Sequence, residues 1–180
     1  MDQVFAPWRI DWVEREDRNE EIDGCVFCTL VDRERATEDR VVVASETAFV
    51  LLNNYPYNPG HAMVIPRTHT GDVRDLDDET LLGHGRLLQR TIDAVETAME
   101  PDGYNVGLNL GRGAGGSVKE HLHTHVVPRW REDTNFMPVV ADTSVIVEAV
   151  DASYDRLRAA FATQDGTTDP GPDRPIRIET

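Results

Sequence analysis

One long helical segment lies among several short β-rich segments, and this pattern restricts the chain to few folds. The β-rich segments are residues 41–44, 47–52, 62–65, 104–110 and 121–127. The helical segment begins near Asp77, a residue type that caps helices, and ends before Pro101. A second helix is predicted over residues 151–162. Because short strands follow one another with few helices between them, we predict an α+β fold with an antiparallel sheet of about five strands, one long helix and a C-terminal helix.

The chain of 180 residues has the length of one domain. Its composition changes once, near Gln164. From there to Thr180 the sequence lacks hydrophobic periodicity and contains three of the ten prolines. We therefore predict a domain over residues 1–163 and a flexible C-terminal tail over residues 164–180.

The charge is strongly acidic, with 33 Asp and Glu residues against 18 Lys and Arg residues, a net charge of -15. Lys119 is the only lysine. This balance argues against nucleic acid as a partner, and the scarcity of lysine suggests adaptation to a saline, halophilic cytosol. No signal peptide and no apolar run of membrane-spanning length is visible, so we expect a soluble, cytoplasmic protein without a membrane partner.

Three of the six histidines alternate with other residues in the segment His121-Leu-His123-Thr-His125. In an extended strand, alternate side chains share one face, about 6–7 Å apart. Two interpretations fit such a row: a metal site, or a histidine nucleophile among phosphate-binding neighbours.

A glycine-rich loop precedes the histidines and favours the second interpretation. It runs from Asn109 to Ser117, where glycines let backbone N–H groups approach an anion. The cations near it in sequence are Arg112, Lys119, Arg129 and Arg131. Loop and cations together predict a local anion site, which a simple metal site would not need.

These residues resemble the histidine triad family, whose signature is matched by His121-Leu-His123-Thr-His125-Val-Val. Residues 53–69 resemble the second segment of that family. The N-terminal FAPWRIDWV and CVFC resemble its bacterial and archaeal branch of dinucleoside polyphosphate phosphorylases or hydrolases. The resemblance covers about residues 5–160 and is closer to the fragile-histidine-triad group than to the nucleoside phosphoramidases.

The resemblance implies a reaction and roles for individual residues. His123 would attack the α-phosphorus of a nucleotide, and the nucleotidyl-histidine would be resolved by water or phosphate. His125 would bind or protonate phosphate oxygens, and His61 and His121 would complete the histidine cluster. The nucleotide and its phosphates would be bound by Asn53, Asn109, Gly115, Gly116 and Ser117.

The two cysteines, Cys25 and Cys28, have a C-x-x-C spacing that suits a metal or a redox pair. With His69 and His121 they resemble the ligands in zinc-bearing family members. Four such ligands would form a closed, structural zinc site. We expect no organic cofactor.

The resemblance also implies a homodimer with a nucleotide as its small-molecule substrate. Three rival functions remain: hydrolysis of nucleoside phosphoramidates, a nucleotide-binding or sensing module with slow chemistry, and a metalloenzyme that uses the three histidines. His84, in the long helix between two glycines, is expected to be a surface or packing residue.

Overall fold

A computed structural model describes residues 24–33, 36–114, 118–131, 133 and 149–180. The N-terminal FAPWRIDWV lies outside these residues. The elements, in chain order, are α2 (Val26–Arg33), α3 (Ala36–Asp39), β1 (Val41–Ala44), β2 (Ala48–Leu52), β3 (Ala62–Pro66), η2 (Val73–Asp75), α4 (Asp78–Met99), β4 (Gly103–Leu108), η3 (Arg112–Ala114), β5 (Thr124–Arg129), α6 (Val150–Ala162), β6 (Thr167–Thr168) and β7 (Ile176–Ile178). Among the helices of these residues, none is both long and apolar enough to cross a membrane.

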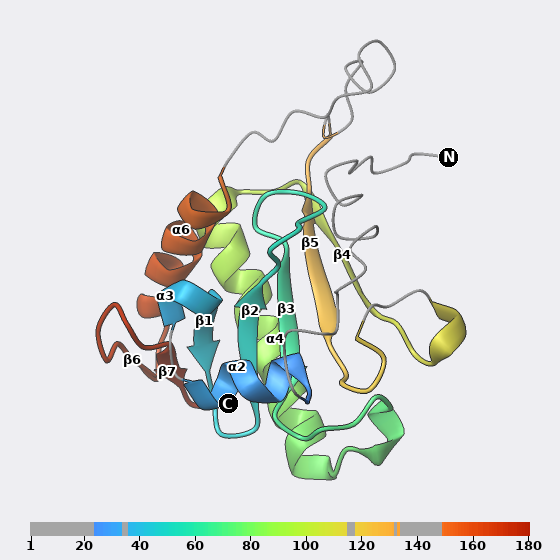
Figure 1. Cartoon of the computed structure of the whole chain (residues 1–180). Coiled ribbons are helices and arrows are strands. Elements are labelled where there is room, and N and C mark those ends of the chain that lie inside the picture. Colours follow the sequence, from blue (N-terminus) through green and yellow to red (C-terminus); the bar gives the residue numbers. More distant parts are fainter. Residues whose placement is uncertain (1–23, 34–35, 115–117, 132, 134–148) are drawn as a thin grey trace.

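The strands form one sheet in the order β4-β5-β3-β2-β1-β7-β6. Every strand pair is antiparallel except β1 with β7, which is parallel. Helices α4 and α6 lie together on one face of the sheet, and α2 crosses the other face (Figure 1). The α+β class is confirmed, while the sheet is mixed and has more strands than predicted.

Alternating side chains of the central strands fill a core on each face. On β3, Val64 belongs to the core beneath α4 and α6, whereas Met63 and Ile65 belong to the core beneath α2. Strands buried on both faces read as continuous apolar runs, which explains the sequences VVVA and AFVLL.

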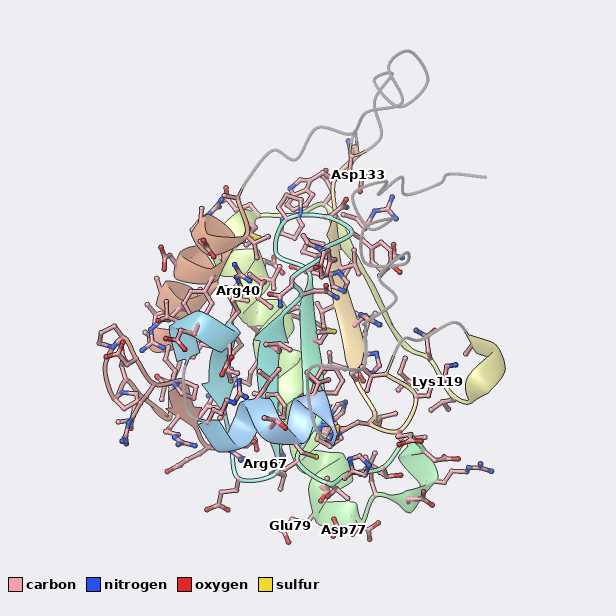
Figure 2. All side chains as sticks on the ribbon, in the orientation of Figure 1. Arg40, Arg67, Asp77, Glu79, Lys119 and Asp133 are labelled. Carbon is pink, nitrogen blue, oxygen red and sulfur yellow. The ribbon has the colours of Figure 1, made fainter. Side chains whose placement is uncertain are left out.

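Helix α4 begins where the sequence predicted, because Asp77 caps it. The Asp77 carboxylate accepts a hydrogen bond of 2.7 Å from the Thr80 backbone N–H at the end of the helix labelled in Figure 2. Leu81, an apolar residue near the start of the helix, is 44% exposed. The residues that α4 buries are Thr80, Gly83, His84, Leu87, Thr91, Ala94, Val95 and Met99. Several of these are small or polar, so apolar residues alone do not mark the buried face of α4.

The prediction of a flexible tail over residues 164–180 is wrong for the residues that enter the sheet. β7 pairs with β1, where Val43 lies opposite Ile176, and β6 pairs with β7. Ile176 is completely buried in the core of α4 and α6. The segment is too short and proline-rich to show periodicity, but its two alternating isoleucines cover apolar surface that β1 would otherwise expose.

Candidate functional site

The histidine cluster lies on the face of the sheet that α2 covers. His125 on β5 pairs with Met63 of β3, whose side chain packs in the core beneath α2. His61 directly precedes β3, and α2 lies across these strands in Figure 1. Two neighbouring strands and one helix therefore bring the cluster together.

Strand β5 begins at Thr124, three residues later than predicted, so His121 and His123 precede it. The Leu122 N–H bonds the Thr70 carbonyl at 2.6 Å, outside the sheet. The rings of His123 and His125 are 5.0 Å apart between centroids and nearly perpendicular. The three imidazoles are therefore not an even row along one strand.

His123 is positioned with one ring nitrogen available for chemistry. Its Nδ1 lies 2.9 Å from the His121 carbonyl oxygen, so Nδ1 must carry the proton and donate it. The Nε2 of the neutral ring then has a free lone pair. Burial lowers the pKa of His123, and the hydrogen bond to the carbonyl opposes this in part. Since the side chain is 6% exposed, the neutral, nucleophilic form is favoured near pH 7.

His61 and His125 form a hydrogen-bonded pair with a defined direction. The Tyr57 backbone N–H donates to His61 Nδ1 at 3.1 Å, so the His61 proton resides on Nε2. His61 Nε2 lies 2.9 Å from His125 Nδ1 and donates to it. The proton of a neutral His125 is therefore on Nε2, which can donate to a phosphate oxygen or a leaving group.

The loop that carries His61 is tied to the end of β5. The His61 N–H donates to the Asn58 carbonyl, and the Asn58 side chain donates to the Pro128 carbonyl at 2.9 Å and to Asp133 at 3.0 Å. Asp133, labelled in Figure 2, pairs with the Arg129 guanidinium, which holds the pKa of that carboxyl below its usual range. This network fixes the loop, and with it the ring of His61.

Two of the four cations predicted for an anion site, Arg129 and Arg131, have other partners. Arg129 pairs with Asp133 and donates to Asn105 at 2.6 Å. The Arg131 side chain lies 3.8 Å from Asp102. Both arginines bind carboxylates of this chain, so the prediction that they supply an anion site is not supported by the geometry.

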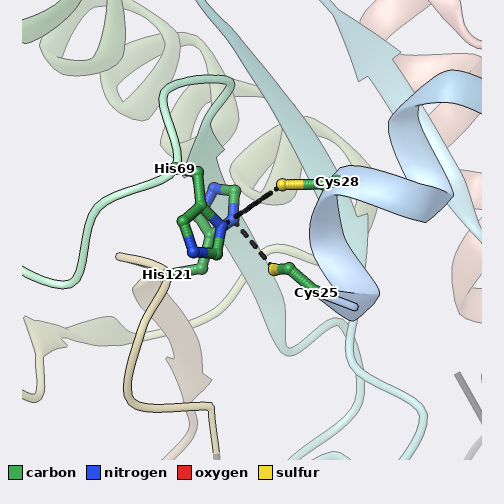
Figure 3. A group of neighbouring side chains, drawn as sticks. All are labelled: Cys25, Cys28, His69 and His121. Carbon is green, nitrogen blue, oxygen red and sulfur yellow. Dashed lines mark hydrogen bonds between the residues drawn. The ribbon is translucent and has the colours of Figure 1, made fainter. Parts of the chain in front are cut away.

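Cys25, Cys28, His69 and His121 converge on one point (Figure 3). One ligand atom from each residue lies within 4.8 Å of all the others. Cys25 Sγ is 3.2 Å from His121 Nδ1, and Cys28 Sγ is 3.4 Å from His69 Nδ1. The cysteines come from α2 and the residue before it, and the histidines from the segments that follow β3 and precede β5. These four side chains can hold a metal ion.

His121 is oriented for such a role. Its Nε2 lies 2.7 Å from the Pro66 carbonyl oxygen, to which it must donate its proton. Nδ1 is then unprotonated and faces the two sulfur atoms. An imidazole that ligates a metal through one nitrogen usually donates a hydrogen bond through the other, which fixes its ring. His121 also supplies the carbonyl that binds His123, so one residue connects the four-ligand cluster to the His123 ring.

Phe27 is a residue of the site that sequence reasoning missed. It lies between the two cysteines and is 4% exposed. Its ring centroid is 5.5 Å from that of His121 and 5.3 Å from that of His123. It provides part of the apolar environment that desolvates both imidazoles. The available signal was its place inside the C-x-x-C segment.

The predicted nucleotide-binding residues are only partly described. Asn53 uses its side chain locally, because its carbonyl oxygen accepts from the Tyr55 N–H at 2.8 Å, and its backbone N–H donates to the His61 carbonyl. Asn109 is exposed and follows Leu108, which pairs with Thr124, the residue after His123. Gly115, Gly116 and Ser117 lie outside the described residues.

A contact that the sequence did not predict joins α4 to β5, on the face of the sheet opposite to the histidine cluster. His84 is 7% exposed, and its Nε2 lies 2.9 Å from the Thr124 hydroxyl. His84 is therefore a packing residue and not a surface residue, so only one of the two expected roles is confirmed. Burial lowers the pKa of His84.

The buried His84 predicts a dependence of stability on pH. Below about pH 6.5 the unfolded chain binds a proton at this histidine more readily than the folded protein does. Stability therefore falls as the pH falls from 7 towards 5. We expect the free energy of unfolding of the wild type to fall more steeply than that of His84→Gln, by up to about 1.4 kcal/mol per pH unit. Urea unfolding at several pH values measures both slopes, and equal slopes would contradict the prediction.

Comparison with known proteins shows which family has this fold and site. The profile of the HIT domain matches residues 34–132. A relative named AP-4-A phosphorylase, from Mycobacterium tuberculosis, is 33% identical over 168 residues, which is 91% of this chain and 86% of the relative. An adenosine 5'-monophosphoramidase from Schizosaccharomyces pombe is 33% identical over 110 residues, covering 61% of this chain and 77% of the relative.

A solved structure shows the same fold. The zinc-bound histidine triad family protein from Mycobacterium smegmatis is 31% identical, covers 77% of this chain and 94% of its own, and superposes with a TM-score of 0.62. The chain belongs to the HIT domain family, as its histidine motif predicted. The general activity supported by these relatives is that of a nucleotide hydrolase or transferase.

Proposed function

We propose that this protein cleaves dinucleoside polyphosphates of the diadenosine tetraphosphate type through a nucleotidyl-histidine intermediate. The proposal rests on one observation, that two adjacent imidazoles have their Nε2 atoms in opposite protonation states. His123 presents an unprotonated Nε2, whereas His125 presents a protonated one. A nucleophile and a proton donor with rings 5.0 Å apart can serve the two ends of one displacement. The relationship to the AP-4-A phosphorylase supports the choice of substrate.

In the proposed reaction, His123 Nε2 forms a bond to the α-phosphorus, and the bond from that phosphorus to its bridging oxygen breaks. The leaving nucleoside polyphosphate takes the electron pair of that bond. His125 donates its Nε2 proton to a phosphate oxygen or to the leaving oxygen and is oriented by His61. Water or inorganic phosphate then attacks the same phosphorus and releases His123. Asn53, Asn109, Gly115, Gly116 and Ser117 are the proposed contacts to the nucleotide and its phosphates.

Cys25, Cys28, His69 and His121 would hold the metal ion, and we propose zinc. Two thiolates and two imidazoles form a donor set that zinc prefers, and ligands around a tetrahedral zinc lie about 3.3–3.8 Å apart. The sulfur–nitrogen distances of 3.4 and 3.6 Å lie in that range, and the distance of 3.2 Å between Cys25 Sγ and His121 Nδ1 is slightly below it. With all four positions filled by protein, the ion would stabilise structure. It would hold α2, and therefore Phe27, beside the nucleophile.

Identification of the products tests the function. Purified protein is incubated in high salt with diadenosine tetraphosphate, with and without inorganic phosphate, and products are identified by mass spectrometry. Attack at the α-phosphorus yields ATP plus AMP with water, or ATP plus ADP only when phosphate is present. Absence of turnover under both conditions would contradict the proposal.

Hydrolysis of nucleoside phosphoramidates is a second candidate, because the Schizosaccharomyces pombe relative is a monophosphoramidase. The same histidine nucleophile would attack phosphorus and expel an amine. A side-by-side comparison of kcat/KM for diadenosine tetraphosphate and adenosine 5'-phosphoramidate separates the two. A clear preference for the phosphoramidate would replace the first proposal by the second.

We also propose a homodimer that uses the outer edge of β4. Val106 and Leu108 pair with Val126 and Thr124, so they lie on the face that carries α4. They are nevertheless 45% and 36% exposed. An apolar edge strand of this kind is typical of an interaction surface.

Replacement of Val106 and Leu108 by glutamate is expected to dissociate the dimer. Like charges would then meet across the interface without partners. Analytical ultracentrifugation should give twice the chain mass of 20.2 kDa for the wild type and the single-chain mass for the variant. Ala159→Glu adds a charge on the exposed face of α6, away from β4, and should remain dimeric. A wild type that sediments as a monomer would contradict the proposal.

A further inference from the structure

The contact between His84 and Thr124 joins the long helix to the strand at the point between the two reactive histidines. Thr124 is the residue between His123 and His125, and its side chain points to the opposite face of the sheet. Both partners are almost completely buried, with 7% of His84 and 4% of Thr124 exposed. The bond of 2.9 Å is thus shielded from competing water.

Thr124 is also the first residue of β5. It pairs with Val64 on one side and with Leu108 on the other, and none of the described residues that precede it, 118–123, pairs with either strand. The backbone of His123 therefore leaves the sheet at this residue. The position of the His123 backbone depends on how firmly Thr124 is held. The pairing of Thr124 with β3 and β4 holds it from both sides within the sheet. The hydrogen bond between the Thr124 hydroxyl and His84 restrains Thr124 in the direction perpendicular to the sheet.

A packing role alone would not need a histidine at this position. Burial of an imidazole carries a desolvation cost that a leucine would avoid, and His84 Nδ1 is buried without a hydrogen-bond partner among the described residues. The neighbouring Gly83 brings α4 close to the sheet, because a Cβ there would lie 2.1 Å from Thr47 Oγ1. A helix held this close allows the short reach from His84 Nε2 to the Thr124 hydroxyl. A buried polar pair of this kind favours one position of the two elements over neighbouring ones.

We propose that His84 and Thr124 are positioning residues that set the placement of the His123 imidazole relative to that of His125. This inference rests on the proposed nucleotidyl transfer. Both side chains are buried against each other on the face of the sheet that carries α4, away from the reactive histidines. Their bond acts through the backbone of residues 123–125, which determines whether the nucleophile and the proton donor meet the same phosphoryl group.

Paired substitutions test the inference by kinetics. Thr124→Val removes the hydroxyl at nearly constant volume, and His84→Leu removes the imidazole. Because small displacements of reacting groups cost catalysis heavily, each should lower kcat by about 10-fold and change KM less than about two-fold. The double variant should be no worse than either single variant, since both remove one interaction. Thr124→Ser and His84→Gln keep a hydrogen-bonding group and should retain kcat within about three-fold of the wild type.

Several results would overturn the inference. One is a loss of kcat in the double variant equal to the product of the two single losses. Another is an effect on KM alone. A third is unchanged kcat for Thr124→Val at a temperature where thermal unfolding shows it to be fully folded. Thermal unfolding of every variant is measured in parallel, so a reduced folded fraction is not mistaken for a reduced kcat.

A spectroscopic measurement separates failure of this inference from failure of the proposed function. Two-bond ¹H–¹⁵N NMR of the imidazoles reports which nitrogen of His123 carries the proton, with no substrate present. In the wild type we expect the Nδ1–H tautomer, and in Thr124→Val a mixture of tautomers as the bond to the His121 carbonyl weakens. If the wild type turns over no nucleotide but the tautomers change as expected, the proposed function fails and the positioning role holds. An unchanged tautomer in Thr124→Val overturns the positioning role.

Discussion

Replacement of His123 by alanine is expected to lower turnover of diadenosine tetraphosphate by at least about 1,000-fold, because no neighbouring side chain can replace the attacking nitrogen. His125 Nδ1 is already bonded to His61, and His121 Nε2 is bonded to the Pro66 carbonyl. Thermal unfolding of the variant is measured in parallel, because the replaced ring is buried beside Phe27. Steady-state kinetics with product identification measures the effect.

Two controls make this result specific. Glu79→Gln, an exposed residue at the start of α4, should retain full activity. His123→Gly should recover part of its activity when free imidazole is added, because a small nucleophile can then occupy the vacated space. Unchanged turnover in His123→Ala would exclude the covalent route. It would favour a nucleotide-binding module whose slow chemistry does not use this histidine.

The double variant Cys25→Ser, Cys28→Ser is expected to lose its bound metal ion and to unfold about 10 °C below the wild type. Binding to the folded state alone contributes about 4 kcal/mol when the free metal concentration is 1,000 times Kd. In a chain of this length, each kcal/mol changes Tm by about 2–4 °C. Elemental analysis of the purified protein should find one zinc ion per wild-type chain and none in the variant, with Tm from calorimetry.

Arg33→Ser is the matched control for the cysteine substitutions. Arg33 lies at the exposed end of the same helix, α2, and offers no ligand to the cluster. Its metal content and Tm should equal those of the wild type. A wild-type protein that binds no metal, or a double variant that keeps a full equivalent, would contradict the assignment of the four ligands.

The order of short strands around one long helix predicted the fold class correctly, the histidine motif predicted the family, and Asp77 and Pro101 predicted the limits of α4. These features are local. A capping aspartate, a proline after the helix and alternating apolar residues act within a few positions of one another. The same locality explains the error at residues 164–180, where the isoleucines of β7 become strand residues only because β1 provides an edge beside them.

The sequence by itself determined the α+β class, the residue types of the site and the pairing of two cysteines with two histidines through the family resemblance. Only the tertiary structure decided which nitrogen of His61, His121 and His123 carries the proton, since this depends on which backbone group lies 2.7–3.1 Å from each nitrogen. It also decided that Arg129 binds Asp133 and that His84 reaches Thr124 across 40 residues of sequence. Hydrogen bonds act over about 3 Å, so residues far apart in the chain acquire these roles only once packing brings them together.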